Sequence, residues 1–261
     1  MMRTTTALLF VAAVALVPPP AAATDPPSAN ALIDGAIAAH GGRDALSAYP
    51  HLEMTGSYES FGRGAGRRSD LVYRERGDGA YRREITFEFR GRKVTPIEFY
   101  DREVVKRRFF RGWDDLPTDE AAEGAAHRLT WLLTLDPSEA RVEGAGTEAD
   151  VAVWSLSVPD GRDRAVLHLA QDDGRLVALE YPGTSAEGMG TKEEVQRKLI
   201  YRDHRQVGAL LLPFDIEWSE DGQPRARLRF DTIEPLDEFD PAWLRVPDPT
   251  RRFIPSEELA F

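Results

Sequence analysis

Residues 39–59 read AHGGRDALSAYPHLEMTGSYE, and the chain changes its hydrophobic period within this stretch. Upstream, Ser28 is a suitable cap for a helix over residues 29–40, and the Gly-Gly pair supplies the positive φ that ends such a helix. After a second short turn over residues 43–48, apolar and polar residues alternate, which predicts a half-buried strand. The apolar members of this alternation are Leu52, Met54 and Tyr58.

His40, beside the glycine pair, raises the question of a catalytic site. A histidine suits the negative C-terminal end of a helix, and no pattern of a base or nucleophile accompanies it. We therefore interpret His40 as a structural residue and not as a catalytic one.

A period of two residues then dominates the chain. Short turns rich in Gly and Asp separate the alternating runs, and such turns join antiparallel neighbours. The expected strands are residues 52–59, 69–76, 80–90, 94–100, 103–111, 151–158, 164–171, 175–181, 194–203, 211–219 and 225–233. An antiparallel sheet of about ten or eleven strands is too wide to stay flat. The sequence therefore predicts a mainly β fold with helices (α+β), in which the sheet curls into a barrel or half-barrel.

A helical run interrupts the strands. Thr118 and the acids that follow it form a helix start, and the run ends near Pro137. Apolar residues recur at helical spacing between these points, at Ala122, Ala125, Ala126, Leu129, Leu132 and Leu133. We expect a helix over residues 119–135 that covers the concave face of the sheet as a lid.

The first 23 residues have the layout of a secretory signal peptide. Arg3 gives a short positive end, residues 7–17 form an unbroken apolar run, and small residues suited to cleavage follow up to Ala23. The run is too short for a membrane span, and no Cys follows it to carry a lipid. We expect one domain over residues 24–261, exported to the periplasm or secreted.

Composition narrows the function classes. The chain has no Cys, which excludes disulfides, thiol catalysis and Cys-ligated metals. Its formal net charge of −11 disfavours a nucleic-acid partner, because phosphate binding depends on cationic surface.

Motifs for catalysis and metal binding are missing from the sequence. The five histidines show neither HExxH nor HxH spacing, and no G-x-S-x-G motif occurs. The glycines at residues 62–66 resemble a phosphate loop, but a strand follows them instead of a helix. His168 shares a strand face with Val166 and Ala170, and we interpret it as a polar-face or satisfied core residue. We expect no catalytic residue, no metal and no cofactor.

Apolar and aromatic side chains fall at positions that could face one interior. A curled sheet of this width encloses more volume than its own side chains fill, whereas a solid core without a cavity is the alternative. The candidate ligand-contacting residues are Leu52, Met54, Tyr58, Phe87, Phe89, Phe99, Leu129, Trp131, Leu132, Trp154, Phe214, Trp218 and Phe230.

Residues 102–115, REVVKRRFFRGWDD, form a basic-aromatic cluster. Such a cluster could contact anionic lipid headgroups or a partner protein. It also fits an edge strand whose charged side chains block aggregation. The residues of this candidate patch are Lys106, Arg107, Arg108, Arg111 and Trp113.

The opening stretch resembles the start of the LolA-like group of exported proteins, which includes the periplasmic lipoprotein carriers and the outer-membrane lipoprotein-sorting family. The end of the chain is also similar to this group, in residues 201–218 (YRDHRQVGALLLPFDIEW) and 225–247 (RARLRFDTIEPLDEFDPAWLRVP). The resemblance covers nearly the whole mature chain. It implies an unclosed antiparallel β-barrel with helices over a hydrophobic cavity that takes acyl chains.

Three hypotheses about function follow. The first is a periplasmic, non-enzymatic carrier or sensor of a lipid, a lipoprotein acyl chain or another hydrophobic ligand. The second is an interaction or structural module of the cell envelope that uses the basic-aromatic strand. The third is an enzyme that uses scattered carboxylates or histidines.

Overall fold

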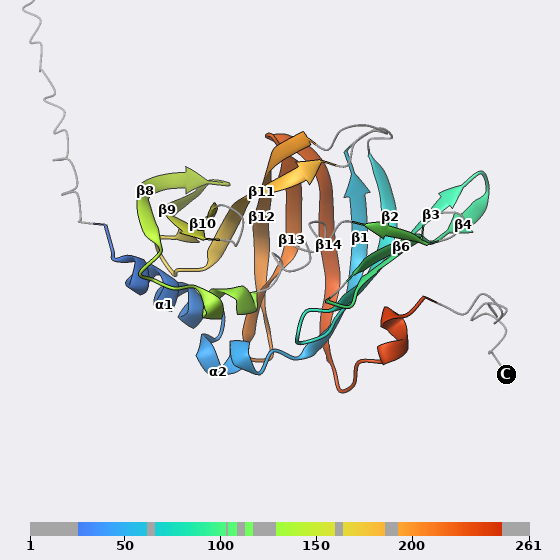
Figure 1. Cartoon of the computed structure of the whole chain (residues 1–261), viewed down its shortest axis with the longest axis horizontal. Coiled ribbons are helices and arrows are strands. Elements are labelled where there is room, and N and C mark those ends of the chain that lie inside the picture. Colours follow the sequence, from blue (N-terminus) through green and yellow to red (C-terminus); the bar gives the residue numbers. More distant parts are fainter. Residues whose placement is uncertain are drawn as a thin grey trace, which may run out of the picture.

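The computed structural model describes residues 26–61, 66–102, 104–108, 113–116, 129–159, 164–185 and 193–246 (Figure 1). The strands of the first half are β1 His51–Ser60, β2 Arg67–Glu75, β3 Tyr81–Phe89, β4 Arg92–Val94, β5 Ile97–Tyr100, β6 Val105–Arg108 and β7 Asp114–Leu116. Those of the second half are β8 Arg141–Glu148, β9 Val151–Pro159, β10 Arg164–Ala170, β11 Leu176–Ser185, β12 Glu193–Val207, β13 Leu210–Glu220 and β14 Gln223–Leu236. The helices are α1 Ala29–Ala39, α2 Gly42–Ser47 and two 3₁₀ helices, η1 Leu129–Thr134 and η2 Pro241–Leu244.

The described strands form one antiparallel sheet that is not closed. Its order is β7-β6-β5-β3-β2-β1-β14-β13-β12-β11-β10-β9-β8, and β4 pairs with β3 outside this path. The mainly β architecture and the open sheet confirm the sequence-based prediction. The expected number of strands was too small, because β4, β7 and β8 were missed. β8 is an exposed edge strand with two glycines and no apolar alternation, so its sequence carries no signal of period two.

The first and last long strands pair at the centre of the sheet, where β1 runs antiparallel to β14. The register shifts between Thr55 and Gly56, and Gly56 lies so close to β14 that an added Cβ would come within 2.0 Å of the Arg229 carbonyl oxygen. Only glycine allows this approach of two backbones. The pairing joins segments at opposite ends of the chain into one sheet.

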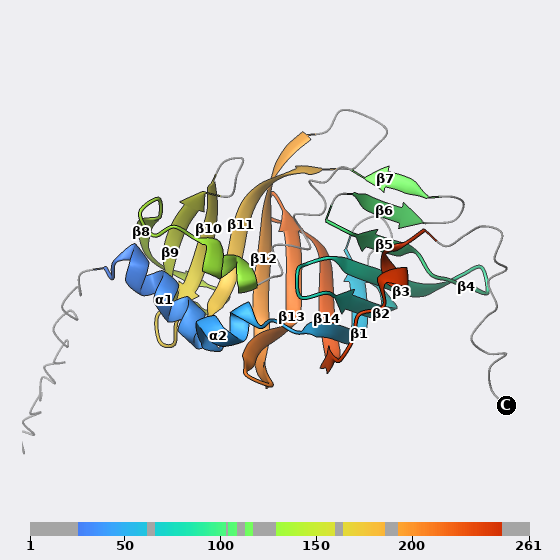
Figure 2. The same cartoon turned by 60° about the horizontal axis from the view of Figure 1, so that its bottom comes forward.

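The N-terminal helices pack on one face of the sheet, which we call the helix face. Ser28 Oγ accepts a hydrogen bond from the Ala31 N–H at 3.2 Å, which confirms the expected cap of α1. The buried face of α1 joins α2, η1 and the strands in one apolar core that includes Leu156, Leu167 and Leu179. Figure 2 shows α1, α2 and η1 together beside β9–β12. The helices therefore pack on the half of the sheet that ends at β8.

His40 and Gly41 fix the end of α1 to the sheet. The Leu176 N–H donates to His40 Nε2 at 3.0 Å, so Nδ1 carries the proton and donates to the Leu211 carbonyl oxygen at 2.7 Å. Gly41 has φ of +113°, and a Cβ there would come within 2.3 Å of the Ala209 carbonyl oxygen. His40 is a structural residue as expected, although its side chain bonds to β11 and β13 and not to its own helix.

The helix expected over residues 119–135 is described only at its end. Residues 117–128 lie outside the described ranges, and the remainder is the 3₁₀ helix η1. The Thr134 hydroxyl donates to the Trp131 carbonyl oxygen at 2.8 Å, and Pro137 follows soon after. Such short ends of a helical run commonly adopt 3₁₀ geometry. The lid over the concave face therefore stays a prediction.

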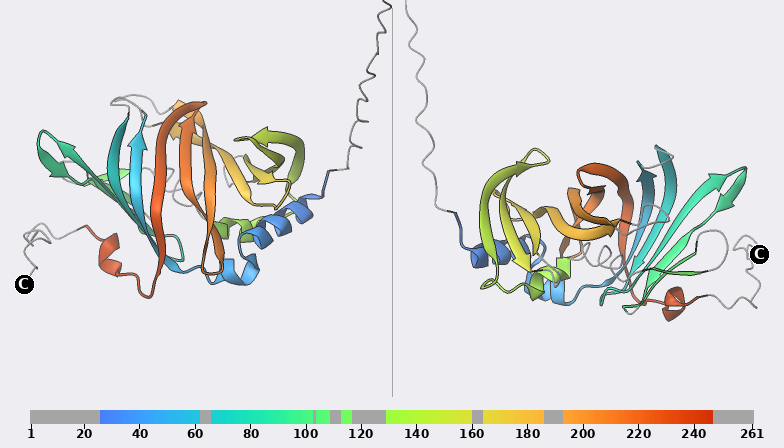
Figure 3. Two further views of the ribbon diagram at one scale, coloured as in Figure 1. Left: turned by 180° about the vertical axis from the view of Figure 1, so that it is seen from behind. Right: turned by 45° about the horizontal axis from the view of Figure 1, so that its top comes forward.

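The β8–β12 end of the sheet curls away from the helices, toward the face we call the opposite face. Strands lie about 4.8 Å apart, so β8 and β12 would be roughly 19 Å apart in a flat sheet. Glu148 Oε2 on β8 nevertheless lies 2.6 Å from Lys198 Nζ on β12. The two side chains together are too short to span the flat-sheet distance between their backbones, so the strands must curl toward each other. Figures 1 and 3 show β8, β9 and β10 turned out of the line of β12–β14. We call this part the curl.

At the other end of the sheet, η2 packs on the opposite face. Phe239 and Leu244 form a small core with Phe99, and the Arg74 guanidinium lies over the Trp243 ring. No helix within the described residues is long and apolar enough to cross a membrane. The predicted signal peptide lies outside the described residues.

Candidate functional site

An apolar hollow lies on the helix face where β13, β14, β1 and β2 meet. Its space for the centres of water molecules is about 30 Å³, and the surrounding empty space of about 420 Å³ includes open solvent. Its only charged lining residue is Glu75. Among the described residues the lining is Tyr49, Met54, Tyr73, Glu75, Leu212, Pro213, Ile216, Leu228, Phe230 and Ile233. The register explains this convergence, because Met54 lies opposite both Tyr73 and Ile233, and Ile216 lies opposite Leu228.

The structure brings only part of the predicted ligand-contacting set to this hollow. Met54 and Phe230 line it. Several others belong to the core on the helix face, namely Leu52, Tyr58, Leu129, Trp131, Leu132, Trp154, Phe214 and Trp218. Phe99 packs on the opposite face, Phe89 is exposed at the end of β3, and Phe87 precedes it on the same strand.

Sequence reasoning did not select Tyr49, Tyr73, Glu75, Pro213 or Ile233 as lining residues. Leu212 and Ile216 belong to the apolar alternation of residues 211–219, and Leu228 belongs to that of residues 225–233. This alternation is the signal that could have selected them. Ile233 lies beyond the bulge at Asp231 on β14, so counting alternate residues along this strand does not predict its neighbours.

The candidate basic patch is divided by the alternation of β6. Arg107 lies on the helix face opposite Glu98, whereas Lys106 and Arg108 point to the other face. The Arg108 guanidinium lies over the Trp113 ring, 5.6 Å from its centroid. Arg111 lies outside the described residues. The described part of β6 therefore presents its cations to two different faces.

Glu98 is buried in an ionic cluster one strand away from the hollow. Arg83 Nη2 donates to Glu98 Oε1 at 2.9 Å, and Arg107 Nε donates to Glu98 Oε2 at 2.8 Å. The Tyr81 hydroxyl donates to Oε1 at 3.0 Å. Burial by itself raises the pKa of Glu98, but the two guanidinium charges outweigh it and hold the pKa below its ordinary value. Tyr73, which lines the hollow, lies opposite Arg83 in the register.

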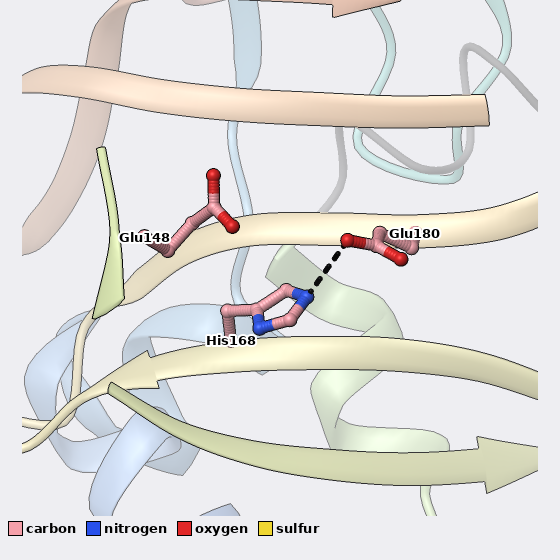
Figure 4. A group of neighbouring side chains, drawn as sticks. All are labelled: Glu148, His168 and Glu180. Carbon is pink, nitrogen blue, oxygen red and sulfur yellow. Dashed lines mark hydrogen bonds and ion pairs between the residues drawn. The ribbon is translucent and has the colours of Figure 1, made fainter. Parts of the chain in front are cut away.

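A second polar group lies inside the curl, on the opposite face (Figure 4). His168 Nε2 lies 3.2 Å from Glu180 Oε1, and His168 Nδ1 lies 3.0 Å from Ser155 Oγ. The prediction of a satisfied polar-face histidine is confirmed. Burial raises the pKa of Glu180, yet hydrogen bonding and charge from Lys198 lower it below its ordinary value. Lys198 bonds both Glu148 and Glu180, which raises its own pKa although burial opposes this.

The order Ser155, His168, Glu180 is that of a hydrolase relay. Ser155, however, lies within the internal strand β9 and pairs with Gly144 on one side and His168 on the other. The backbone N–H groups around it belong to these ladders, so they do not converge as an oxyanion hole. This arrangement favours a structural polar row over a nucleophilic site.

His204 lies in a polar hollow of about 410 Å³ on the same side of the sheet as the curl, with Asp173, Arg175 and Arg202 in its lining. His204 Nε2 donates to the Leu176 carbonyl oxygen at 3.1 Å. Burial, followed by the charges of His40 and Arg175, lowers the pKa of His204 to about 4. Its neutral ring therefore supports the junction of α1 with β11 and does not act as a base near pH 7.

Comparison with known proteins supports the fold. No protein-family model and no curated protein matches the chain. A LolA superfamily protein from Nitrosomonas europaea has the same fold, with a TM-score of 0.53, 11% identity, and coverage of 84% of this chain and 99% of that chain. An outer membrane lipoprotein-sorting protein domain from Vibrio parahaemolyticus is similar as well, with a TM-score of 0.53 and 8% identity. The alignment covers 83% of this chain and 97% of that chain.

At these identities the comparison establishes the fold alone. The chain has the LolA-like fold, and the resemblance read from its two ends is confirmed at that level.

Proposed function

We propose that the protein is an exported, non-enzymatic carrier that binds an apolar ligand, a lipid or a lipoprotein acyl chain, in the hollow on the helix face. The observation that carries this proposal is the hollow itself, in which nine of the ten lining residues are uncharged and most are aliphatic or aromatic. A concave, mainly apolar site with few polar groups is typical of ligand binding. The shared fold with a lipoprotein-sorting domain supports the same choice.

Within this proposal, Met54 and Phe230 contact the ligand directly. Tyr58, Phe214 and Trp218 lie on the same face of the neighbouring strands and extend the apolar surface along them. The predicted helix over residues 119–135 covers the bound ligand, and the predicted signal peptide delivers the protein to the periplasm.

The first test is a titration of delipidated protein with a fluorescent fatty acid. Wild-type protein is expected to bind it, and Leu228→Trp is expected to weaken binding at least roughly tenfold, because the larger ring fills the hollow. Val104→Trp adds the same ring at an exposed position away from the hollow, so it serves as the matched control and should bind like wild type.

Circular dichroism of Leu228→Trp would show whether the variant keeps its fold. No uptake by the wild-type protein, or equal uptake by wild type and folded Leu228→Trp, would contradict the proposal. Native mass spectrometry of protein purified from the periplasm would identify a co-purified lipid by its mass.

A further inference from the structure

Five consecutive strands each contribute one polar side chain to a single row on the inside of the curl. They are Glu148 on β8, Ser155 on β9, His168 on β10, Glu180 on β11 and Lys198 on β12. The row begins at Ser155 and runs through His168, Glu180 and Lys198 to Glu148, with polar atoms 2.6–3.2 Å apart at each step. The curvature of the sheet brings β8 near β12 and so places these five side chains in contact.

Three of these residues offer the donor atoms of a metal site. One ligand atom from each of Glu148, His168 and Glu180 lies within 4.8 Å of the other two (Figure 4). Ligand atoms around a tetrahedral ion with bonds of about 2.1 Å lie roughly 3.4 Å apart. His168 Nε2 and Glu180 Oε1, at 3.2 Å, already have this spacing. The Glu148 oxygen lies within 4.8 Å of both, so a small movement of its side chain would complete the set.

The Lys198 ammonium shows that this position favours a cation. Its Nζ lies 2.6 Å from Glu148 Oε2 and 3.0 Å from Glu180 Oε1. The two carboxylates and the ammonium together carry a net charge of −1, in a group whose side chains are largely buried. A divalent ion in place of the ammonium would bring this charge to zero. The flexible four-carbon stem of lysine permits that exchange, and the Lys198 side chain retains 26% of its exposure.

Ser155 fits both states of His168. Without a metal, Nε2–H donates to Glu180 and the Ser155 hydroxyl donates to Nδ1. With a metal on Nε2, the proton moves to Nδ1, and the same hydroxyl oxygen accepts from it. Such a partner on the far nitrogen is the usual support of a metal-binding histidine. The polar hollow adjoins this group, since Ala149 and Val151, which follow Glu148, line it.

We propose that Glu148, His168 and Glu180 bind a divalent transition-metal ion such as Zn²⁺, which replaces the Lys198 ammonium between the two carboxylates. One imidazole nitrogen with two carboxylate oxygens suits ions of this class better than Ca²⁺ or Mg²⁺, which prefer all-oxygen sites. The bound ion would cross-link β8, β10 and β11 and so fix the curl. This proposal is independent of the ligand-binding function.

The test is calorimetric titration of chelator-treated full-length protein with Zn²⁺, together with Co²⁺ absorption as a direct report of nitrogen and oxygen ligands. Wild type is expected to bind one ion. His168→Ala should lower the affinity at least roughly a hundredfold, and Ser155→Ala roughly tenfold. Lys198→Met removes the competing ammonium and should tighten binding at least roughly tenfold. His51→Asn removes a histidine outside the row and should bind like wild type.

Each result decides the proposal. Absence of Zn²⁺ binding by both wild type and Lys198→Met would overturn the site, as would His168→Ala binding with wild-type affinity and an unchanged Co²⁺ spectrum. Unchanged affinity in Lys198→Met would overturn the exchange with lysine. If His168→Ala fails to fold, Glu148→Gln at the exposed edge strand removes a different ligand and should also lose the ion.

Discussion

The apolar hollow and the curl belong to one sheet, but they use the two faces of its strands in opposite ways. On the helix face, side chains from β13, β14, β1 and β2 surround a space that they do not fill. On the opposite face, the curl from β8 to β12 brings five polar side chains into direct contact. Packing is incomplete in the first region, whereas polar groups are fully paired in the second.

The difference shows that the curvature of a sheet determines whether a strand face forms an open apolar surface or an enclosed polar row. Alternation alone puts Leu167 on the helix face and His168 on the opposite face of β10. The helices pack on the first face beside β9–β12. Rolling of the sheet encloses the second face. Buried charges need partners within hydrogen-bond distance, which the curl provides and a flat sheet would not.

The largest effect is expected from a pair of matched truncations on the helix face. Leu167 is fully buried in the core, and Leu228 is nearly so but lines the hollow. Leu167→Ala should cost about 4 kcal/mol of unfolding free energy and Leu228→Ala about 2 kcal/mol, because fewer neighbouring atoms lose contact beside an existing space. Urea unfolding measures both. Equal costs would mean that the hollow is closed in solution.

Much of the fold could be predicted from the sequence. The alternation in residues 52–59 and 211–219 and the cap at Ser28 each correspond to an observed element, because one buried face imposes a period of two or of 3.6. β8 escaped prediction since an edge strand with both faces partly exposed needs no such period.

The candidate sites were less predictable, because they depend on contacts between distant strands. Tyr73 meets Ile216 and Phe230 only after β1 has paired with β14, and the sequence contains no signal for that register. Glu148, His168 and Glu180 come from three strands with no motif spacing, so their proximity follows from the curl alone. The divided β6 patch, in contrast, was predictable from alternation.

The second prediction concerns acid, which should loosen the curl end and its junction with α1. His204, beside His40, Asp173 and Arg175, has a pKa of about 4, against 6.5 in the unfolded chain. Between these two values the unfolded chain therefore binds more protons than the folded chain. The contribution of His204 to the unfolding free energy is fully present above pH 6.5 and is lost as the pH falls toward 4. The expected loss is about 2–3 kcal/mol, measured by urea unfolding across this range.

A variant of His204 separates the pH dependence due to this histidine from that due to the carboxylates. Glu98 and Glu180 have pKa values below their ordinary 4.5, so their contribution is lost only in more acidic solution. His204→Gln should reduce the slope between pH 6.5 and 4.5 and leave the part that belongs to His40, whose pKa burial also lowers. His51→Gln, outside the His40–His204 pair, should retain the full slope. An unchanged slope in His204→Gln would assign the effect to other groups.

The smallest effects compare two polar pairs on the opposite face, one at the centre of the sheet behind the hollow and one in the curl. Thr55 Oγ1 lies 2.7 Å from Thr232 Oγ1 on exposed β1 and β14, and Ser155 Oγ lies 3.0 Å from His168 Nδ1 inside the curl. In chelator-treated protein, Ser155→Ala should cost about 1 kcal/mol, because the partly buried imidazole loses a partner that water replaces poorly. Thr55→Val, which keeps the β-branched shape in contact with solvent, should cost at most about 0.5 kcal/mol. Thermal and urea unfolding measure both losses of stability. Equal losses would mean that water reaches the curl as easily as the exposed surface of β1 and β14. The polar row would then lack the burial that makes its hydrogen bonds stabilising.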